Sequence, residues 1–145
     1  MTTGTGAASG VSGRNLADAG DVRVNVRDST VESAHIGIRA LRDATGRGAV
    51  NVDVQDSTVT TTANNAYGIH TTNGSVDATA NDVQEVVVED STITTKGVET
   101  HGIVANRSSV GDIVIKTRNT DIVTESIALG PYDCLLYTSP SPRDS

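Results

Sequence analysis

The sequence has almost no large aromatic side chains, since it contains no Trp, no Phe and three Tyr in 145 residues. Without aromatic residues, a core must be filled by small β-branched side chains. Such side chains suit thin layers of stacked strands better than a thick core of packed helices. Val, Thr, Ser, Asp, Asn and Gly are abundant, and these are residues of strands and turns. The composition therefore predicts an all-β protein.

Basic side chains are also few, because 11 Lys and Arg are set against 18 Asp and Glu, for a net charge of -7 at pH 7. Binding to nucleic acid needs clustered Lys and Arg. No apolar run approaches the length that crosses a bilayer, and residues 1–20 lack the apolar stretch of a signal peptide. We therefore expect no nucleic acid partner and no membrane insertion by this chain.

Cysteine is represented only by Cys134. Residues 134–144 read CLLYTSPSPRD, a string that resembles the in-frame translation of a common transposase sequencing adapter. The resemblance implies that Cys134, Pro140 and Pro142 are not native and that the parent protein is longer at its C-terminus. We therefore treat residues 131–145 as a non-native, adapter-derived tail and exclude it from reasoning about the fold.

Residues 21–130 contain four similar units, which recur about every 30 residues, a spacing typical of repeat architectures. An Asp-Ser-Thr triplet begins at Asp28, Asp56 and Asp90, and Asn119 holds the matching place in the last unit. A Gly-Ile pair follows in the first three units, with Ala128 and Leu129 in the fourth. These pairs are Gly37-Ile38, Gly68-Ile69 and Gly102-Ile103.

Apolar residues alternate with polar ones inside each unit, and a period of two is typical of strands with one buried face. Each unit offers about three short strands separated by turns. The predicted inward positions are Val22, Val24, Val26, Val31 and Ile38, then Val50, Val52, Val54, Val59 and Ile69, then Val86, Val88, Ile93 and Ile103, and finally Ile113, Ile115, Ile122 and Leu129.

Stacking the units in register would place Val on Val and Ile on Ile, and neighbouring units would cover the face that one unit cannot bury alone. The sequence therefore predicts a right-handed parallel β-helix of about three to four coils over residues 21–130. The alternative is a β-sandwich, which would show hairpin turns between strands of varied identity. Residues 1–20 are expected to be a flexible Gly/Ser/Thr-rich lead or part of a preceding coil. Loops are expected at residues 42–48, 63–66 and 73–81.

The pattern VxVxDST followed by a Gly-Ile pair resembles the passenger region of bacterial autotransporters, a pertactin-like or pectin-lyase-like β-helix, over about residues 21–130. The resemblance implies export to the surface of a Gram-negative bacterium and a C-terminal membrane β-barrel in the parent, outside this chain. It also implies a structural or adhesive stalk. Host-surface or polysaccharide ligands would then bind to loops or to exposed strand residues such as Thr60, Thr62, Thr94 and Lys96.

No residue is expected to be catalytic or to hold a cofactor or metal. Asp28, Asp56 and Asp90 would form a column that either binds a cation or caps the turns. Asn119 in the same place favours the turn, because Asn caps without charge. His35, His70 and His101 occupy different positions in the repeat and do not form a metal-ligand ladder.

The alternative function is that of a β-helical polysaccharide-degrading enzyme, either a lyase or a glycosidase. Asn119-Thr120-Asp121, Thr100-His101-Gly102 and Val114-Ile115-Lys116 resemble polygalacturonase motifs, but their order differs and no Asp-Asp pair exists. A lyase would need a calcium cluster and a base such as Arg39 or Lys116. An enzyme should also project a cluster of acids from one sheet, whereas the acids of this sequence fall at expected turns. An uncapped coil end near Gly130 would expose strand edges, so we expect the isolated chain to aggregate or fold only marginally.

Overall fold

The computed structural model describes residues 9–17, 20–42, 47–74, 83–107 and 112–125. Within these ranges no segment forms a helix long and apolar enough to cross a membrane. The elements are all strands: β1 (Ser9–Asn15), β2 (Val22–Arg27), β3 (Thr30–Ser33), β4 (Ile36–Arg42), β5 (Val50–Gln55), β6 (Thr58–Thr61), β7 (Tyr67–Asn73), β8 (Gln84–Glu89), β9 (Thr92–Thr95), β10 (His101–Arg107), β11 (Ile113–Arg118) and β12 (Asp121–Thr124).

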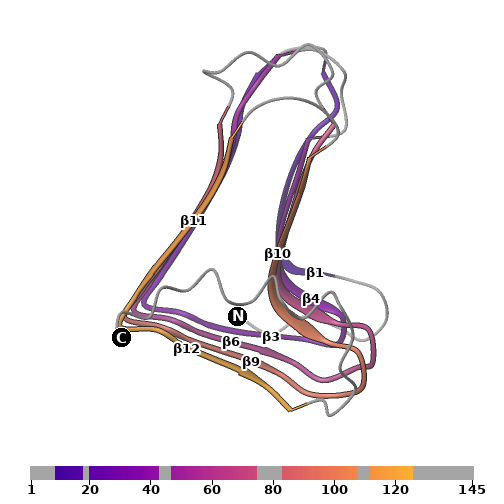
Figure 1. The fold of residues 1–145 in the computed structure, drawn as a ribbon, viewed down its shortest axis with the longest axis vertical. Coiled ribbons are helices and arrows are strands. Elements are labelled where there is room, and N and C mark those ends of the chain that lie inside the picture. Colours follow the sequence, from indigo (N-terminus) through magenta and orange to yellow (C-terminus); the bar gives the residue numbers. More distant parts are fainter. Residues whose placement is uncertain (1–8, 18–19, 43–46, 75–82, 108–111, 126–145) are drawn as a thin grey trace.

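The strands form three four-stranded sheets, in the orders β1-β4-β7-β10, β11-β8-β5-β2 and β12-β9-β6-β3, and all their pairings are parallel. The chain visits the sheets in turn, so each coil adds one strand to each sheet. Two sheets form long walls and the third a base when the molecule is viewed along the stack (Figure 1). The protein is therefore a parallel β-helix of about three to four coils, as the repeat predicted, and its right-handedness stays a prediction.

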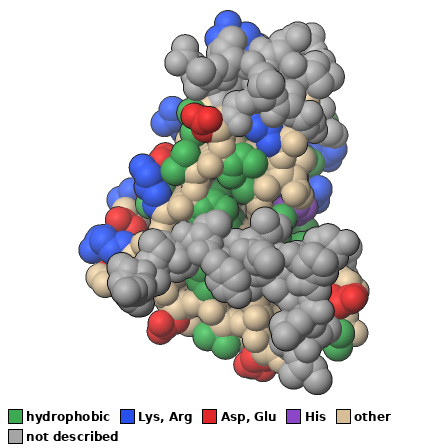
Figure 2. All heavy atoms as spheres, viewed as in Figure 1, with side chains coloured by type: hydrophobic (Ala, Val, Ile, Leu, Met, Phe, Trp, Pro, Cys, Tyr) green, Lys and Arg blue, Asp and Glu red, His purple; other side chains and the backbone are tan. Residues whose placement is uncertain are grey.

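Like residues stack on like along the coils, because the strands pair in the register of the repeat. Val31 lies opposite Val59, which lies opposite Ile93. Hydrophobic side chains fill the space between the three walls, while charged side chains lie on the outside (Figure 2). The predicted inward residues of the first three units are all buried: Val22, Val24, Val26, Val31, Ile38, Val50, Val52, Val54, Val59, Ile69, Val86, Val88, Ile93 and Ile103.

The fourth unit is packed less completely. Ile113 is 43% exposed, whereas Ile115 and Ile122 are partly buried against the core. β11 and β12 each pair with a neighbour on one side only within the described residues. The side chains of this coil are therefore covered on one side alone. Leu129 lies outside the described residues.

The Gly-Ile pair has a steric cause. A Cβ atom added to Gly68 would meet the Ile93 side chain and would lie 2.6 Å from the carbonyl oxygen of Gly102. Gly37 stands in the same relation to Val59 and to the Gly68 carbonyl. The glycines therefore let the Val59 and Ile93 side chains of the next coil pack directly against the backbone of the β1-β4-β7-β10 sheet.

Two parts of the chain differ from a simple reading of the loops and lead. Ser9–Asn15 forms β1 and pairs with β4, so this part of the segment 1–20 belongs to the stack. Arg42 and Asn73, taken as the first residues of loops, are buried strand ends. Arg42 donates hydrogen bonds to the carbonyl oxygens of Gly20 and Arg47 at 2.8 and 2.7 Å.

Candidate functional site

The Asp-Ser-Thr triplets mark one corner of the coil, where the chain passes from the β2-β5-β8-β11 sheet to the β3-β6-β9-β12 sheet. Asp28, Asp56, Asp90 and Asn119 have φ angles of 48°, 48°, 49° and 47°. Asn and Asp enter this left-handed region more readily than other residues with a Cβ atom. The column of acids is thus explained by the backbone turn that each residue makes.

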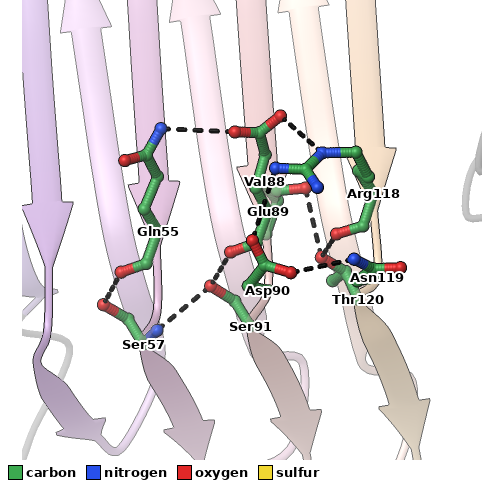
Figure 3. A network of polar contacts seen from close by, with 9 residues as sticks. All are labelled: Gln55, Ser57, Val88, Glu89, Asp90, Ser91, Arg118, Asn119 and Thr120. Atoms are coloured by element: carbon green, nitrogen blue, oxygen red, sulfur yellow. Dashed lines mark hydrogen bonds and ion pairs between the residues drawn. The ribbon is translucent and has the colours of Figure 1, made fainter.

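The serine after each Asp satisfies the backbone at this corner. Ser57 Oγ donates to the Gln55 carbonyl at 2.6 Å and accepts from the backbone N–H of Ser29 at 3.1 Å. Ser91 repeats the arrangement one coil on, with Oγ donating to the Glu89 carbonyl and accepting from Ser57 N (Figure 3). The backbone groups at this corner are therefore capped by the serine hydroxyl.

The acids of the corner are engaged by neighbouring side chains in the last coil. Asp90 accepts hydrogen bonds from Asn119 Nδ2 at 2.9 Å and from Arg118 Nη2 at 3.4 Å (Figure 3). Arg118 also binds Glu89 Oε2 at 3.1 Å, and this hydrogen bond lowers the pKa of Glu89 while raising that of Arg118. In the described ranges, no group of three or more His, Cys, Asp and Glu side chains is placed to hold a metal.

A shallow depression of about 410 Å³ lies on the outer face of the β2-β5-β8-β11 sheet. Seven of its eight lining residues occupy the outward positions of the alternating strands, and Val52 is the buried exception. Amides and carboxylates predominate. The lining consists of Arg23, Asn25, Asn51, Val52, Asp53, Gln55, Glu85 and Val87.

This face corrects the expectation that the acids stand only at turns. Asp53, Glu85 and Glu89 project outward from β5 and β8. Asp53 pairs with Arg27 at 3.1 Å and Glu85 with Lys116 at 3.2 Å, each on a neighbouring strand. The alternation predicted that these acids point outward, but only the register shows which cations lie beside them.

Three side chains in the depression are of interest for binding. The amides of Asn25 and Asn51 make no hydrogen bond to any described residue, whereas Asp53 Oδ1, which has no partner there either, is buried. Val87 is an outward, half-buried apolar residue in a row that otherwise holds Asn25, Asp53 and Lys116. The depression thus combines free amides with one apolar contact.

Two of the three histidines meet on a different face, the outer side of the β1-β4-β7-β10 sheet. The Tyr67 ring stacks on His70 and His101, with ring centroids 4.8 and 5.6 Å apart. Burial, with a smaller effect of Arg39, lowers the pKa of His70. Sequence reasoning missed this cluster because it compared the histidines only with one another. Tyr67 and His101 both precede the Gly-Ile pair and lie opposite each other on β7 and β10, and His70 follows on the same strand as Tyr67.

The motifs that resemble polygalacturonase elements do not converge. His101 lies on β10, and Lys116 lies on β11 in the opposite wall (Figure 1). Asn119 makes the corner turn before β12. Among the exposed residues named for ligand contact, Thr60 and Thr94 are paired on the outer face of the third sheet, while Thr62 and Lys96 lie in the turns that follow.

Comparison of the chain with protein-family models, with curated proteins and with solved structures finds no match. The resemblance to autotransporter passengers and the resemblance of the tail to an adapter sequence therefore remain predictions from the sequence.

Proposed function

We propose that this chain is a structural and adhesive stalk segment of a bacterial cell-surface protein of the autotransporter type. The observation that carries the proposal is the stack of parallel coils. The inward side chains pack in the core, and the outward side chains form continuous faces. Each coil adds about 4.8 Å of length. Repetition therefore lengthens the molecule and enlarges its surface while the contacts between neighbouring coils stay the same.

The polar depression is the part of this surface best suited to ligand contact. The expected ligands are a host-surface or polysaccharide component, which sheet faces and loops can bind along an extended surface. Of the loop predicted at residues 73–81, residues 75–81 lie outside the described residues. The β2-β5-β8-β11 face therefore becomes the first region to test.

Glycan cleavage is the competing function, and one observation favours it: Asp53 and Glu85 line the same depression. A glycosidase needs two carboxyl groups that reach the scissile bond from opposite sides. Here each carboxylate is held by a cation, Arg27 or Lys116. We therefore rank binding above cleavage, and the chain is not proposed as an enzyme.

Adhesion is tested with beads that carry the folded full chain, compared with beads that carry albumin. Retention on epithelial monolayers and on polysaccharide-coated surfaces is measured under flow, and chain-coated beads are expected to be retained in excess. Equal retention of the two kinds of bead on every surface would exclude adhesion by this chain.

The same polysaccharides, incubated with the chain, test cleavage by an assay of new reducing ends. No release is expected. Release that disappears in both Asp53→Asn and Glu85→Gln would replace the adhesive proposal with an enzymatic one.

A further inference from the structure

We infer that the depression on β2, β5 and β8 binds a neutral saccharide, through the amides of Asn25 and Asn51 and the apolar surface of Val87. This inference rests on the proposed adhesive function and names the ligand class for the same face. The ligand would then bind on the outer surface of a sheet and not in the loops.

The two amides are the polar anchors of the site. Asn25 on β2 lies opposite Asp53 and Asn51 on β5 lies opposite Arg23, so the two asparagines occupy diagonal outward positions on adjacent strands. Each amide offers two N–H donors and one acceptor oxygen, and neither uses them with a described residue. Neighbouring sugar hydroxyls, which both donate and accept, match this arrangement.

Val87 offers an apolar surface beside the amides, and a ligand that uses it must have an apolar face as well as hydroxyls. It stands opposite Asp53 on the neighbouring strand and points outward among polar side chains. A pyranose ring has apolar C–H faces and a polar rim, so it can cover Val87 while its hydroxyls reach the amides. The depression, at about 410 Å³, falls within the usual size range of small-ligand sites.

The charges around the depression favour a neutral ligand, because they are paired with one another. Asp53 and Glu85 line it together with one guanidinium, that of Arg23. The cations that neutralise these acids, Arg27 and Lys116, lie outside the lining. Arg23 itself has Asp21 as an ion-pair partner at 3.9 Å, so each charge of the lining has a counter-ion and no unpaired cation there would attract an anionic saccharide.

The test titrates the folded full chain with oligosaccharides prepared from dextran and galactan, and with oligogalacturonate as an anionic comparison. Binding is measured by isothermal calorimetry at neutral pH. Removing both amides, in Asn25→Ala/Asn51→Ala, is expected to weaken binding of a neutral oligosaccharide by about tenfold or more, because at least two hydrogen bonds are lost.

A matched control truncates two paired outward residues on another sheet, Thr58→Ala/Thr92→Ala, and is expected to bind as the parent does. Val87→Arg, which places a bulky side chain in the depression while keeping both asparagines, should also abolish binding. The circular dichroism spectrum shows whether each variant is folded. Preference for oligogalacturonate, no binding of either neutral probe, or equal binding by the asparagine variant would overturn the inference.

The outcomes separate the site from the function. If beads adhere to cells and the folded asparagine variant adheres equally, adhesion stands and the saccharide site is wrong. If neutral oligosaccharides bind in solution and beads are not retained anywhere, the site stands and the adhesive function is wrong.

Discussion

At the scale of the residue, two adjacent side chains make each corner of the coil. The first, Asp or Asn, accepts a left-handed backbone conformation. The second provides a hydroxyl that bonds the carbonyl two residues before it, and Thr120 does this in the last coil as Ser91 does in the preceding one. The acidic charge of the first residue is not needed for this work, since Asn119 turns the chain in the same way.

Substitutions at Asp56 separate the turn from a cation site. Asp56→Asn is expected to leave the free energy of unfolding almost unchanged. Asp56→Val should lower it by about 1–2 kcal/mol, because a β-branched residue is strained at positive φ. Urea unfolding without added metal measures both variants. If Asp56→Asn is as destabilising as Asp56→Val, the carboxylate itself is needed and the turn explanation is wrong.

Glu89 makes the free energy of unfolding depend on pH in the acidic range. The hydrogen bond from Arg118 lowers the pKa of Glu89 below its ordinary value of 4.5, so the folded state binds this proton less readily than the unfolded state does. The stabilisation is present above pH 4.5 and is lost as the pH falls through the lowered pKa.

Glu89→Gln should therefore be less stable than the parent at pH 7, and the difference should shrink below pH 4.5 and in high salt. Unfolding curves measured from pH 7 to pH 3 provide the check. Glu125→Gln, which removes an exposed carboxylate with no described ion pair, serves as the control. A difference between Glu89→Gln and the parent that is independent of pH would mean that Glu89 acts through packing.

At the scale of the element, a strand's place in the stack decides how much of it is buried. β7 lies between β4 and β10, and Ile69 on it is completely buried. β11 has only β8 beside it among the described strands, and Ile113 on it is 43% exposed. Both isoleucines are inward positions of the repeat, so the difference in their burial follows from the neighbours of their strands.

Truncation of matched isoleucines should reveal this difference. Ile69→Ala is expected to cost about 2–5 kcal/mol, the usual range for a buried isoleucine. Ile113→Ala should cost well under half as much, because part of its surface already meets water. Denaturant unfolding of the two variants gives the comparison. Equal losses would show that β11 is covered as fully as β7.

At the scale of the whole molecule, the fold is a one-dimensional stack in which each coil pairs only with the coils beside it. The terminal coils can therefore lose their packing while the central coils stay folded. The ion pairs of the outer face also join neighbouring coils, but they are exposed and contribute little to stability. Cohesion depends mainly on the continuous core of stacked Val and Ile.

Hydrogen exchange should therefore be uneven along the chain. Amides of β5, β6 and β8, which have strands on both sides, are expected to exchange more slowly than those of β11 and β12. Exchange followed by mass spectrometry on peptides from residues 50–61 and 113–124 tests this. Equal protection of the two peptides would indicate that the coils unfold as one cooperative unit.

The expected aggregation of the isolated chain is tested by size-exclusion chromatography. Strand edges that no described strand covers, and partly covered apolar residues such as Ile113 and Val123, favour self-association. Elution of a sharp, reversibly melting monomer would contradict that expectation.

The sequence by itself determined the parallel stacking, because a period of two specifies which residues point inward and a repeat of about 30 residues specifies what they stack on. It also indicated the corner, since Asn119 replaces Asp there. Only the tertiary structure decided which outward residues form ion pairs and which stay unpaired. Asn25 and Asn51, or Tyr67 and His101, are separated by a full coil or nearly so, and parallel pairing brings them together. The repeat fixes which outward residues lie opposite one another, but ion pairing between them depends on side-chain conformation on the sheet surface, and that has no periodic signature from which a binding face could be predicted.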